Sequence, residues 1–85
     1  MPRWLIQIYT GPTCVHGFAH QCRQAKLRVE MEGTENIYIV VEGIDGDDAA
    51  RNVSVALKRE FGTDFGLFNT IGKVPSYRVL ERLDP

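Results

Sequence analysis

Apolar residues occur along the chain in runs of strand length and in stripes of helical spacing. Residues 4–9 (WLIQIY) are rich in aromatic and β-branched side chains and stop at Gly11-Pro12, which predicts a buried strand. Residues 37–41 (IYIVV) form a continuous apolar run, which is typical of a strand covered on both faces in a parallel sheet. The last such segment, 75–83, alternates and opens with a proline, so it predicts a half-exposed strand.

Two segments between these strands have apolar residues at helical spacing. The first predicts a helix from about residue 17 to residue 32, closed by Gly33. The second predicts a helix that follows the acidic turn 45–48 and is closed by Gly62. Capping explains the acids of this turn better than a catalytic carboxylate pair does. The stripes consist of Phe18, Cys22, Ala25 and Val29 in the first helix and of Ala50, Val53, Leu57 and Phe61 in the second.

The glycine-punctuated segment 62–72 carries four bulky apolar residues, so we expect it to fold over the core. Its glycines do not follow a strand and open a helix, as a phosphate-binding fingerprint requires. The apolar residues are Phe65, Leu67, Phe68 and Ile71.

Length and composition indicate a single globular domain spanning residues 1–85. The chain is 44% hydrophobic and 25% charged, which are ordinary values for a folded protein. No apolar run approaches the roughly 20 residues of a membrane span, and no signal-peptide pattern opens the chain. Two cysteines without a secretion signal favour a reducing compartment, so we expect a cytoplasmic protein that does not enter membranes.

Charge is unevenly distributed although the net charge is only −1. Residues 30–48 hold seven acids and no lysine or arginine, whereas Arg23, Lys26 and Arg28 cluster in the first predicted helix. Nucleic-acid-binding proteins usually show a basic stripe with interleaved aromatic residues. Three basic residues on one helix are more typical of a solvated face, so nucleic acid is not an expected partner.

Every cysteine and histidine of the chain lies between residues 14 and 22, where the first strand passes into the first helix. One interpretation is a zinc site formed by Cys14, His16, His20 and Cys22, since these are ligands that zinc prefers. On a helix, however, Cys22 lies roughly 160° around the axis from His20, and the box lacks the long loop between ligand pairs. We therefore expect no metal.

Two further interpretations remain for the same segment. In the structural one, Cys22 is a small buried hydrophobe on the apolar stripe and the histidines face water. In the redox one, Cys14 is an exposed nucleophile, because backbone N–H groups at a helix start stabilise a thiolate. Both predict that Cys22 is buried and that Cys14 is at least partly exposed.

The order strand, helix, strand, helix, loop, proline, strand, with a thiol at the first junction, resembles the glutaredoxin branch of the thioredoxin-like fold, particularly its short phage-type members. The resemblance implies an α/β domain with a truncated thioredoxin-like βαβαβ core, a three-stranded mixed sheet and two helices. Its first two strands would be parallel neighbours, and the third would run antiparallel to the first. The residues that carry it are Ile6-Gln7-Ile8-Tyr9-Thr10, Cys14 or Cys22, Ala25-Lys26, the strand ending near Asp45, and Lys73-Val74-Pro75.

This resemblance implies a thiol-disulfide oxidoreductase or a monothiol relative, with Cys14 as the nucleophile and Cys22 as the resolving thiol. No cofactor is expected beyond the glutathione that the family uses. The Val74-Pro75 peptide bond would be cis and would pair with the substrate backbone. Substrate-binding residues would be Tyr9, His16, Lys73, Val74 and Pro75.

An alternative function is a non-catalytic protein-binding module on the same scaffold, for example a small phage or accessory protein acting on a host partner. The chain has neither Cys-x-x-Cys nor Cys-x-x-Ser, and a fold does not imply its function. The family's last helix also has no counterpart here, which would leave part of one sheet face uncovered. We therefore expect a protein partner or a homodimer through the sheet face or the edge of the last strand.

Overall fold

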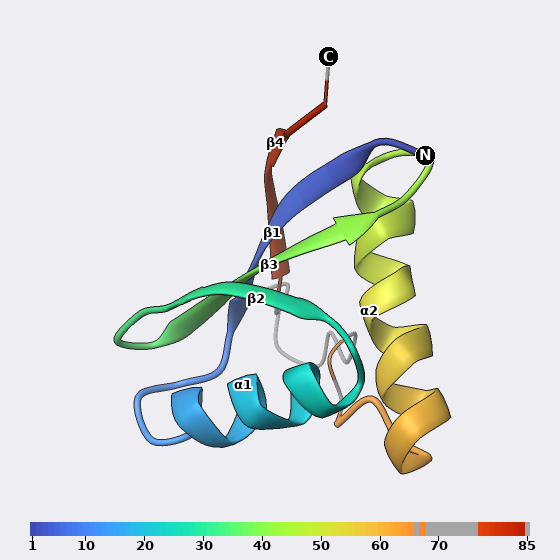
Figure 1. The fold of residues 1–85 in the computed structure, drawn as a ribbon. Helices are drawn as coiled ribbons and strands as arrows, with labels where there is room; N and C mark the ends of the chain where they lie inside the picture. The colour runs from blue at the N-terminus through green and yellow to red at the C-terminus, as the bar shows by residue number, and fades with distance from the viewer. Residues whose placement is uncertain (66, 68–76, 85) are drawn as a thin grey trace.

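The computed structural model describes residues 1–65, 67 and 77–84. Four strands form one sheet in the order β2-β3-β1-β4, and every neighbouring pair is antiparallel (Figure 1). The expected three-stranded mixed sheet of a thioredoxin-like fold is therefore wrong. The elements are β1 (Arg3–Tyr9), α1 (Val15–Gln24), β2 (Arg28–Glu32), β3 (Asn36–Glu42), α2 (Gly46–Phe61) and β4 (Tyr77–Arg82).

The strands expected at 4–9 and 37–41 are neighbours, as predicted, but they run antiparallel rather than parallel. The strand expected after Pro75 does run antiparallel to β1. Each helix connects two strands of the same direction that are separated by a third, so α1 joins β1 to β2 and α2 joins β3 to β4. This connectivity is the split βαβ, or ferredoxin-like, arrangement.

The segment 17–32, expected as one helix, contains most of α1 and the whole of β2. Helix α1 stops at Gln24 because Lys26 adopts a left-handed conformation with φ of 67°. Beyond this residue Val29 pairs with Ile39 and Glu32 with Ile37, which places β2 at one edge of the sheet. The extra strand accounts for the change from three strands to four.

The core lies between one face of the sheet and both helices. The central strands β1 and β3 contribute four isoleucines that are no more than 1% exposed. Burial of each such side chain stabilises the fold by about 1.5–3 kcal/mol. Because the same cluster contains residues of both helices, α1 and α2 cover the same sheet face. The cluster includes Ile6, Ile8, Ile37 and Ile39 from the sheet, Val15, Ala19 and Cys22 from α1, and Ala49, Val53 and Leu57 from α2.

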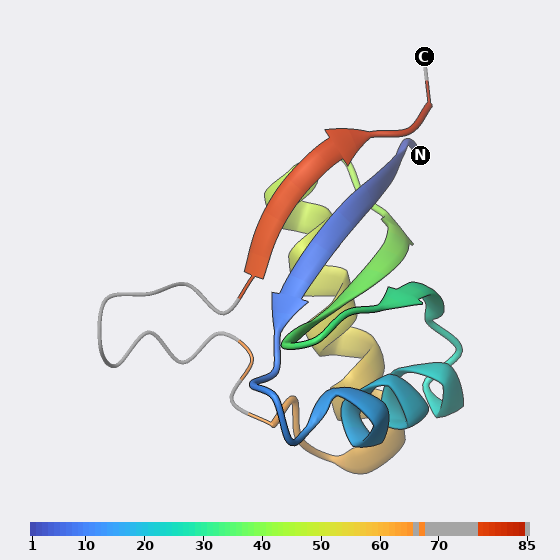
Figure 2. The same ribbon diagram turned by 90° about the vertical axis from the view of Figure 1, so that its left-hand side faces the viewer.

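The opposite face of the sheet, called the open face below, has neither helix against it; Figure 2 shows α2 behind the strands. Alternation along the strands and the pairing register define its side chains. They are Arg28 and Met31 on β2, Asn36, Tyr38, Val40 and Glu42 on β3, Arg3, Leu5, Gln7 and Tyr9 on β1, and Arg78 and Glu81 on β4, with Leu80 at the bulge beside Glu81.

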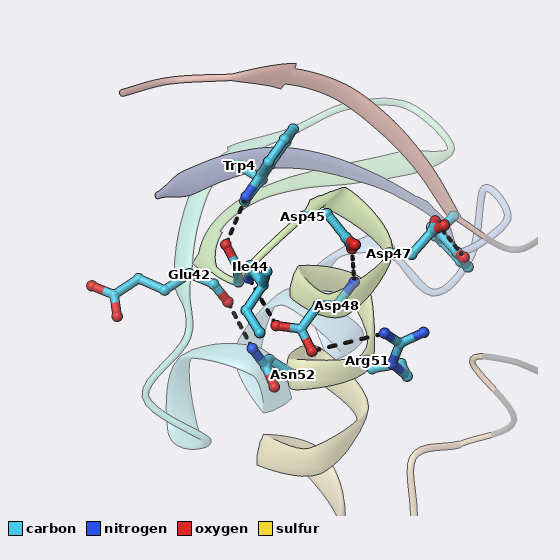
Figure 3. Close-up of polar contacts among 10 residues, drawn as sticks. Trp4, Glu42, Ile44, Asp45, Asp47, Asp48, Arg51 and Asn52 are labelled. Carbon is cyan, nitrogen blue, oxygen red and sulfur yellow. Dashed lines mark hydrogen bonds and ion pairs between the residues drawn. The ribbon is translucent and has the colours of Figure 1, made fainter. Parts of the chain in front are cut away.

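Helix α2 is closed by the predicted Gly62 and begins slightly earlier than predicted, inside the acidic turn 45–48. The carboxylate of Asp45 accepts a hydrogen bond of 2.8 Å from the backbone N–H of Asp48, and Gly62 closes the helix with φ of 77°. Asp48 in turn accepts from the backbone N–H of Ile44 (Figure 3). The Trp4 indole donates to the carbonyl oxygen of Gly43, which fixes the loop before the helix to β1. The acids of this turn therefore serve the helix start.

The first and last strands are joined at their outer ends. Arg3 binds the carboxylate of Asp84 through two side-chain nitrogens at 2.8 and 2.9 Å, and the backbone N–H of Leu83 donates to the carbonyl oxygen of Arg3. This pairing raises the pKa of Arg3 and lowers that of Asp84. Within the described residues, no helix is long and apolar enough to cross a membrane.

Candidate functional site

Cys14 occupies the N-cap position of α1 and is exposed, as predicted. Its sulfur lies 3.7 Å from the hydroxyl of Thr13. The loop that presents it is held to the sheet, because the backbone N–H groups of Thr10 and Gly11 both donate to the carbonyl oxygen of Glu35. Gly11 turns the chain with φ of 80°. The thiol is therefore accessible and sits on a fixed backbone.

Cys22 is fully buried, also as predicted, and is a free thiol like Cys14. Burial raises its pKa to about 12, and the positive charge of Arg23 offsets only part of this effect. The two cysteines are eight positions apart along the helix, or about 12 Å along the axis at 1.5 Å per residue. A disulfide needs Cα atoms within about 7 Å, so the two thiols cannot pair without unwinding α1.

His16 lies on the solvent side of α1, and its hydrogen bond goes to the β2 residue Glu32. Arg23 donates to the other oxygen of that carboxylate at 3.1 Å. The hydrogen bonds from Arg23 and then from His16 hold the pKa of Glu32 below its usual value. His16 therefore takes part in a hydrogen-bonded cluster that ties α1 to β2.

The four residues of the zinc interpretation point in different directions. Cys22 enters the core, whereas Cys14, His16 and His20 are exposed. Among the described side chains, no three of the types that ligate metals lie close enough together to hold an ion. The remaining expected site residues, Lys73, Val74 and Pro75, lie outside the described residues, and so does the expected cis peptide bond.

A pocket of about 510 Å³ opens between the end of β1, the first turns of α1 and the chain after α2. It brings together two residues that the sequence marked, Tyr9 and Cys14, with several that it did not mark as site residues. Phe18 belonged only to the predicted helix stripe, and Phe65 and Leu67 only to the loop expected to cover the core. The lining residues are Ile8, Tyr9, Thr10, Thr13, Cys14, Gly17, Phe18, Gln21, Phe65 and Leu67.

The open face of the sheet is the second candidate site. Its exposed apolar side chains come from three strands: Tyr9 is 55% exposed, Met31 53% and Leu80 41%. In the middle of the face, the amide of Gln7 donates a hydrogen bond of 3.1 Å to the hydroxyl of Tyr38. At the β2 edge, Arg28 pairs with Glu30 at 3.0 Å. The face thus combines exposed apolar side chains with charges of both signs.

Comparisons with known protein families, with curated proteins and with solved structures find no match to this chain. The site must therefore be interpreted from its own geometry.

Proposed function

We propose that the protein is a non-catalytic protein-binding module that pairs with a second copy of itself through its open face. The observation that carries this proposal is the exposure of Tyr9, Met31 and Leu80 on a sheet face that neither helix covers. An apolar surface that extends over several strands is usually claimed by a partner in a soluble protein. Side chains of two such faces interdigitate when sheets pack about 10 Å apart.

The burial of Cys22 disfavours the dithiol mechanism. A resolving cysteine must reach the mixed disulfide as a thiolate. Cys22 is buried in the core with a pKa of about 12, and about two turns of α1 separate it from Cys14. Cys14 alone could still perform monothiol chemistry. His16 does not assist it as a basic neighbour, because the hydrogen bond of His16 goes to Glu32.

Balanced charge favours a second copy over a strongly charged partner. Two arginines on or beside the open face already have acidic partners, since Arg28 pairs with Glu30 and Arg3 with Asp84. Two such faces can therefore meet without the repulsion between like charges that a single-sign surface would cause. Homodimers with two-fold symmetry are also the commonest closed assemblies, and their interfaces are more apolar than transient ones.

Single-stranded nucleic acid is the competing ligand for this face. Tyr9 and Tyr38 lie on the two central strands, and four-stranded sheets of this kind can stack bases on such aromatic residues. Nucleic acid affinity depends, however, on arginines and lysines that neutralise phosphates. Here Arg28 and Arg3 are already paired with acids, so Arg78 is the main remaining group for a phosphate on the described part of this face, and the chain carries a net charge of −1.

Sedimentation equilibrium of the wild type and of three variants tests the proposal. We expect a wild-type dimer at micromolar concentration, and monomers for Met31→Glu and Leu80→Glu, because each buries a charge in the interface. Val55→Glu is the matched control, since Val55 is 49% exposed on α2, away from the open face. It should remain a dimer.

Two outcomes would overturn this proposal. One is a wild type that sediments as a monomer at every concentration, or a dimer that both face variants leave intact. The other is salt-dependent binding of a fluorescent single-stranded oligonucleotide that Leu80→Glu abolishes, which would assign the open face to nucleic acid.

A further inference from the structure

The pocket between β1, α1 and the chain after α2 has the size of a small-molecule site. Its volume of about 510 Å³ lies in the range of roughly 300–1,000 Å³ that is usual for such pockets. Ile8 and Leu67 are 1% and 5% exposed, so the inner surface is formed by core residues. The pocket is thus an extension of the hydrophobic core that opens to solvent.

Aromatic rings form one side of this pocket. The rings of Phe18 and Phe65 meet edge to face, with centroids 6.3 Å apart and an interplanar angle of 86°. Phe65 also lies 5.6 Å from the ring of Phe61 at the end of α2. Arrangements of this kind are the preferred geometry of aromatic pairs, and they accept a further ring readily.

The backbone holds Phe65 in an unusual conformation. Its φ is 58°, a left-handed value that is uncommon for a residue other than glycine. Its N–H donates to the hydroxyl of Thr63, and the neighbouring Asp64 accepts a hydrogen bond of 2.7 Å from Ser54 on α2. A bulky side chain is therefore fixed at the mouth of the pocket, where it is 44% exposed. Residues kept in such conformations cluster at ligand sites.

Gly17 lines the pocket from the side of α1. Glycine is about the least favourable residue for a helix apart from proline. No contact explains it here, because a Cβ atom built at Gly17 would meet nothing within 4 Å. Gly17 is exposed and lines the pocket, so this wall has room for a larger side chain.

We propose that this pocket binds an uncharged aromatic small molecule. None of the ten lining residues among the described ones is a lysine, arginine, histidine, aspartate or glutamate, so these residues offer no counter-charge to an ionic ligand. The polar groups at its rim are neutral donors and acceptors that orient a ligand. They are the hydroxyls of Tyr9, Thr10 and Thr13, the amide of Gln21 and the thiol of Cys14. This site is separate from the proposed pairing of sheet faces, apart from Tyr9 at its edge.

Two fluorescent probes with the same ring system test the proposal on the intact chain. N-phenyl-1-naphthylamine is uncharged, and 1-anilinonaphthalene-8-sulfonate adds one negative charge. We expect the uncharged probe to bind at least tenfold more tightly. It should also slow alkylation of Cys14 by iodoacetamide in the wild type, a readout that needs no variant. Equal or tighter binding of the sulfonate, or unchanged alkylation at saturating uncharged probe, would overturn the proposal.

Variants then place the probe. Gly17→Leu should fill the pocket and weaken binding of the uncharged probe at least tenfold, while circular dichroism shows the same fold. Gly17→Ala tests helix propensity alone and should weaken binding much less. Leu80→Glu, which alters the open face, should leave the affinity unchanged. If Gly17→Leu binds like the wild type, or if Leu80→Glu abolishes binding, the probe is not in this pocket and the proposal is wrong.

Discussion

The backbone N–H of Leu27 donates a hydrogen bond of 2.9 Å to the carbonyl oxygen of Cys22. Together with the bond from the N–H of Lys26 to the carbonyl oxygen of Arg23, it forms a Schellman motif at the end of α1. Leu27 packs against the core cluster that contains Cys22, which supplies the apolar contact common in this motif. The motif turns the chain out of α1 and directly into β2.

Lys26→Gly should stabilise the protein by up to about 1 kcal/mol. Lys26 holds the left-handed position of the motif with φ of 67°, where a side chain costs about 1–2 kcal/mol. Glycine removes this strain, but its larger conformational entropy in the unfolded chain offsets part of the gain. Urea unfolding measures the change. Lys26→Ala is the control and should stay within about 0.5 kcal/mol of the wild type, because it retains the strain. A destabilised glycine variant would contradict this account of the helix end.

The ends of the two helices are not equally predictable from the sequence. Helix α2 could be predicted, because Asp45 caps its start and Gly62 takes the left-handed position at its end. Helix α1 ends with the same kind of turn, but the left-handed residue is Lys26, which gives no signal. Because the apolar stripe extends to Val29, the sequence predicts that the helix continues through this residue. In the structure Val29 packs against the core from strand β2. The sequence prediction therefore lacks strand β2 because the conformation of Lys26 could not be foreseen.

That β3 runs antiparallel to β1 could not be predicted, because the apolar residues of β3 are shielded in two different ways. Ile37 and Ile39 face the helices. Tyr38 and Val40 face the open side, where side chains on the neighbouring strands β1 and β2 shield them. A continuous apolar strand therefore does not require cover on both faces.

At the candidate site, the burial of Cys22 could be predicted, because Cys22 lies on the apolar stripe of the first helix. Partners such as Phe65 could not be predicted, since only the folded chain brings them to α1.

Native thiol labelling should modify Cys14 and spare Cys22. Cys22 is fully buried, and with a pKa of about 12 instead of 9.0 it holds about a thousandfold less thiolate at neutral pH. Mass spectrometry after iodoacetamide treatment should show one modification in the native protein and two in 6 M guanidinium. Similar native rates at both cysteines would show that the core opens around α1.

The same two cysteines should differ in their contribution to stability. Cys22→Ser should cost about 1–3 kcal/mol, because it buries a hydroxyl group among apolar side chains. Cys14→Ser is the matched control at an exposed position and should change stability by less than about 0.5 kcal/mol.

Gly43→Ala should destabilise the protein by about 1–3 kcal/mol. A Cβ at Gly43 would lie 2.4 Å from the backbone nitrogen and 2.6 Å from the Cα of Ala49, so α2 would have to move away from the sheet. Gly17→Ala serves as the control in the same thermal unfolding experiment. It has open space and should be neutral or stabilising by up to about 1 kcal/mol. Equal melting temperatures for the two variants would contradict the close approach of α2.

Glu32→Gln should weaken the dependence of stability on acid pH. The pKa of Glu32 is lower in the folded chain than in the unfolded one, because Arg23 and His16 bind its charged form. Its contribution is therefore complete above about pH 5 and is lost as pH falls through the folded pKa. Urea midpoints from pH 7 to pH 3 should show a smaller decrease for the variant, which starts lower at pH 7. Glu60→Gln, at an exposed position of α2, should follow the wild-type curve.

The central place of β1 sets the order in which the sheet can be completed. The β2–β3 hairpin closes over a short turn, whereas Trp4 of β1 pairs with Arg82 of β4, almost a full chain length away. Contacts between such distant segments form slowly, because a long loop must lose entropy before any pairing compensates for it. Until β4 arrives, one edge of β1 presents unpaired N–H and C=O groups that another chain can pair with. During synthesis β1 emerges before the other strands of this sheet but is the last to have both edges paired, and its free edge is open to aggregation in the interval.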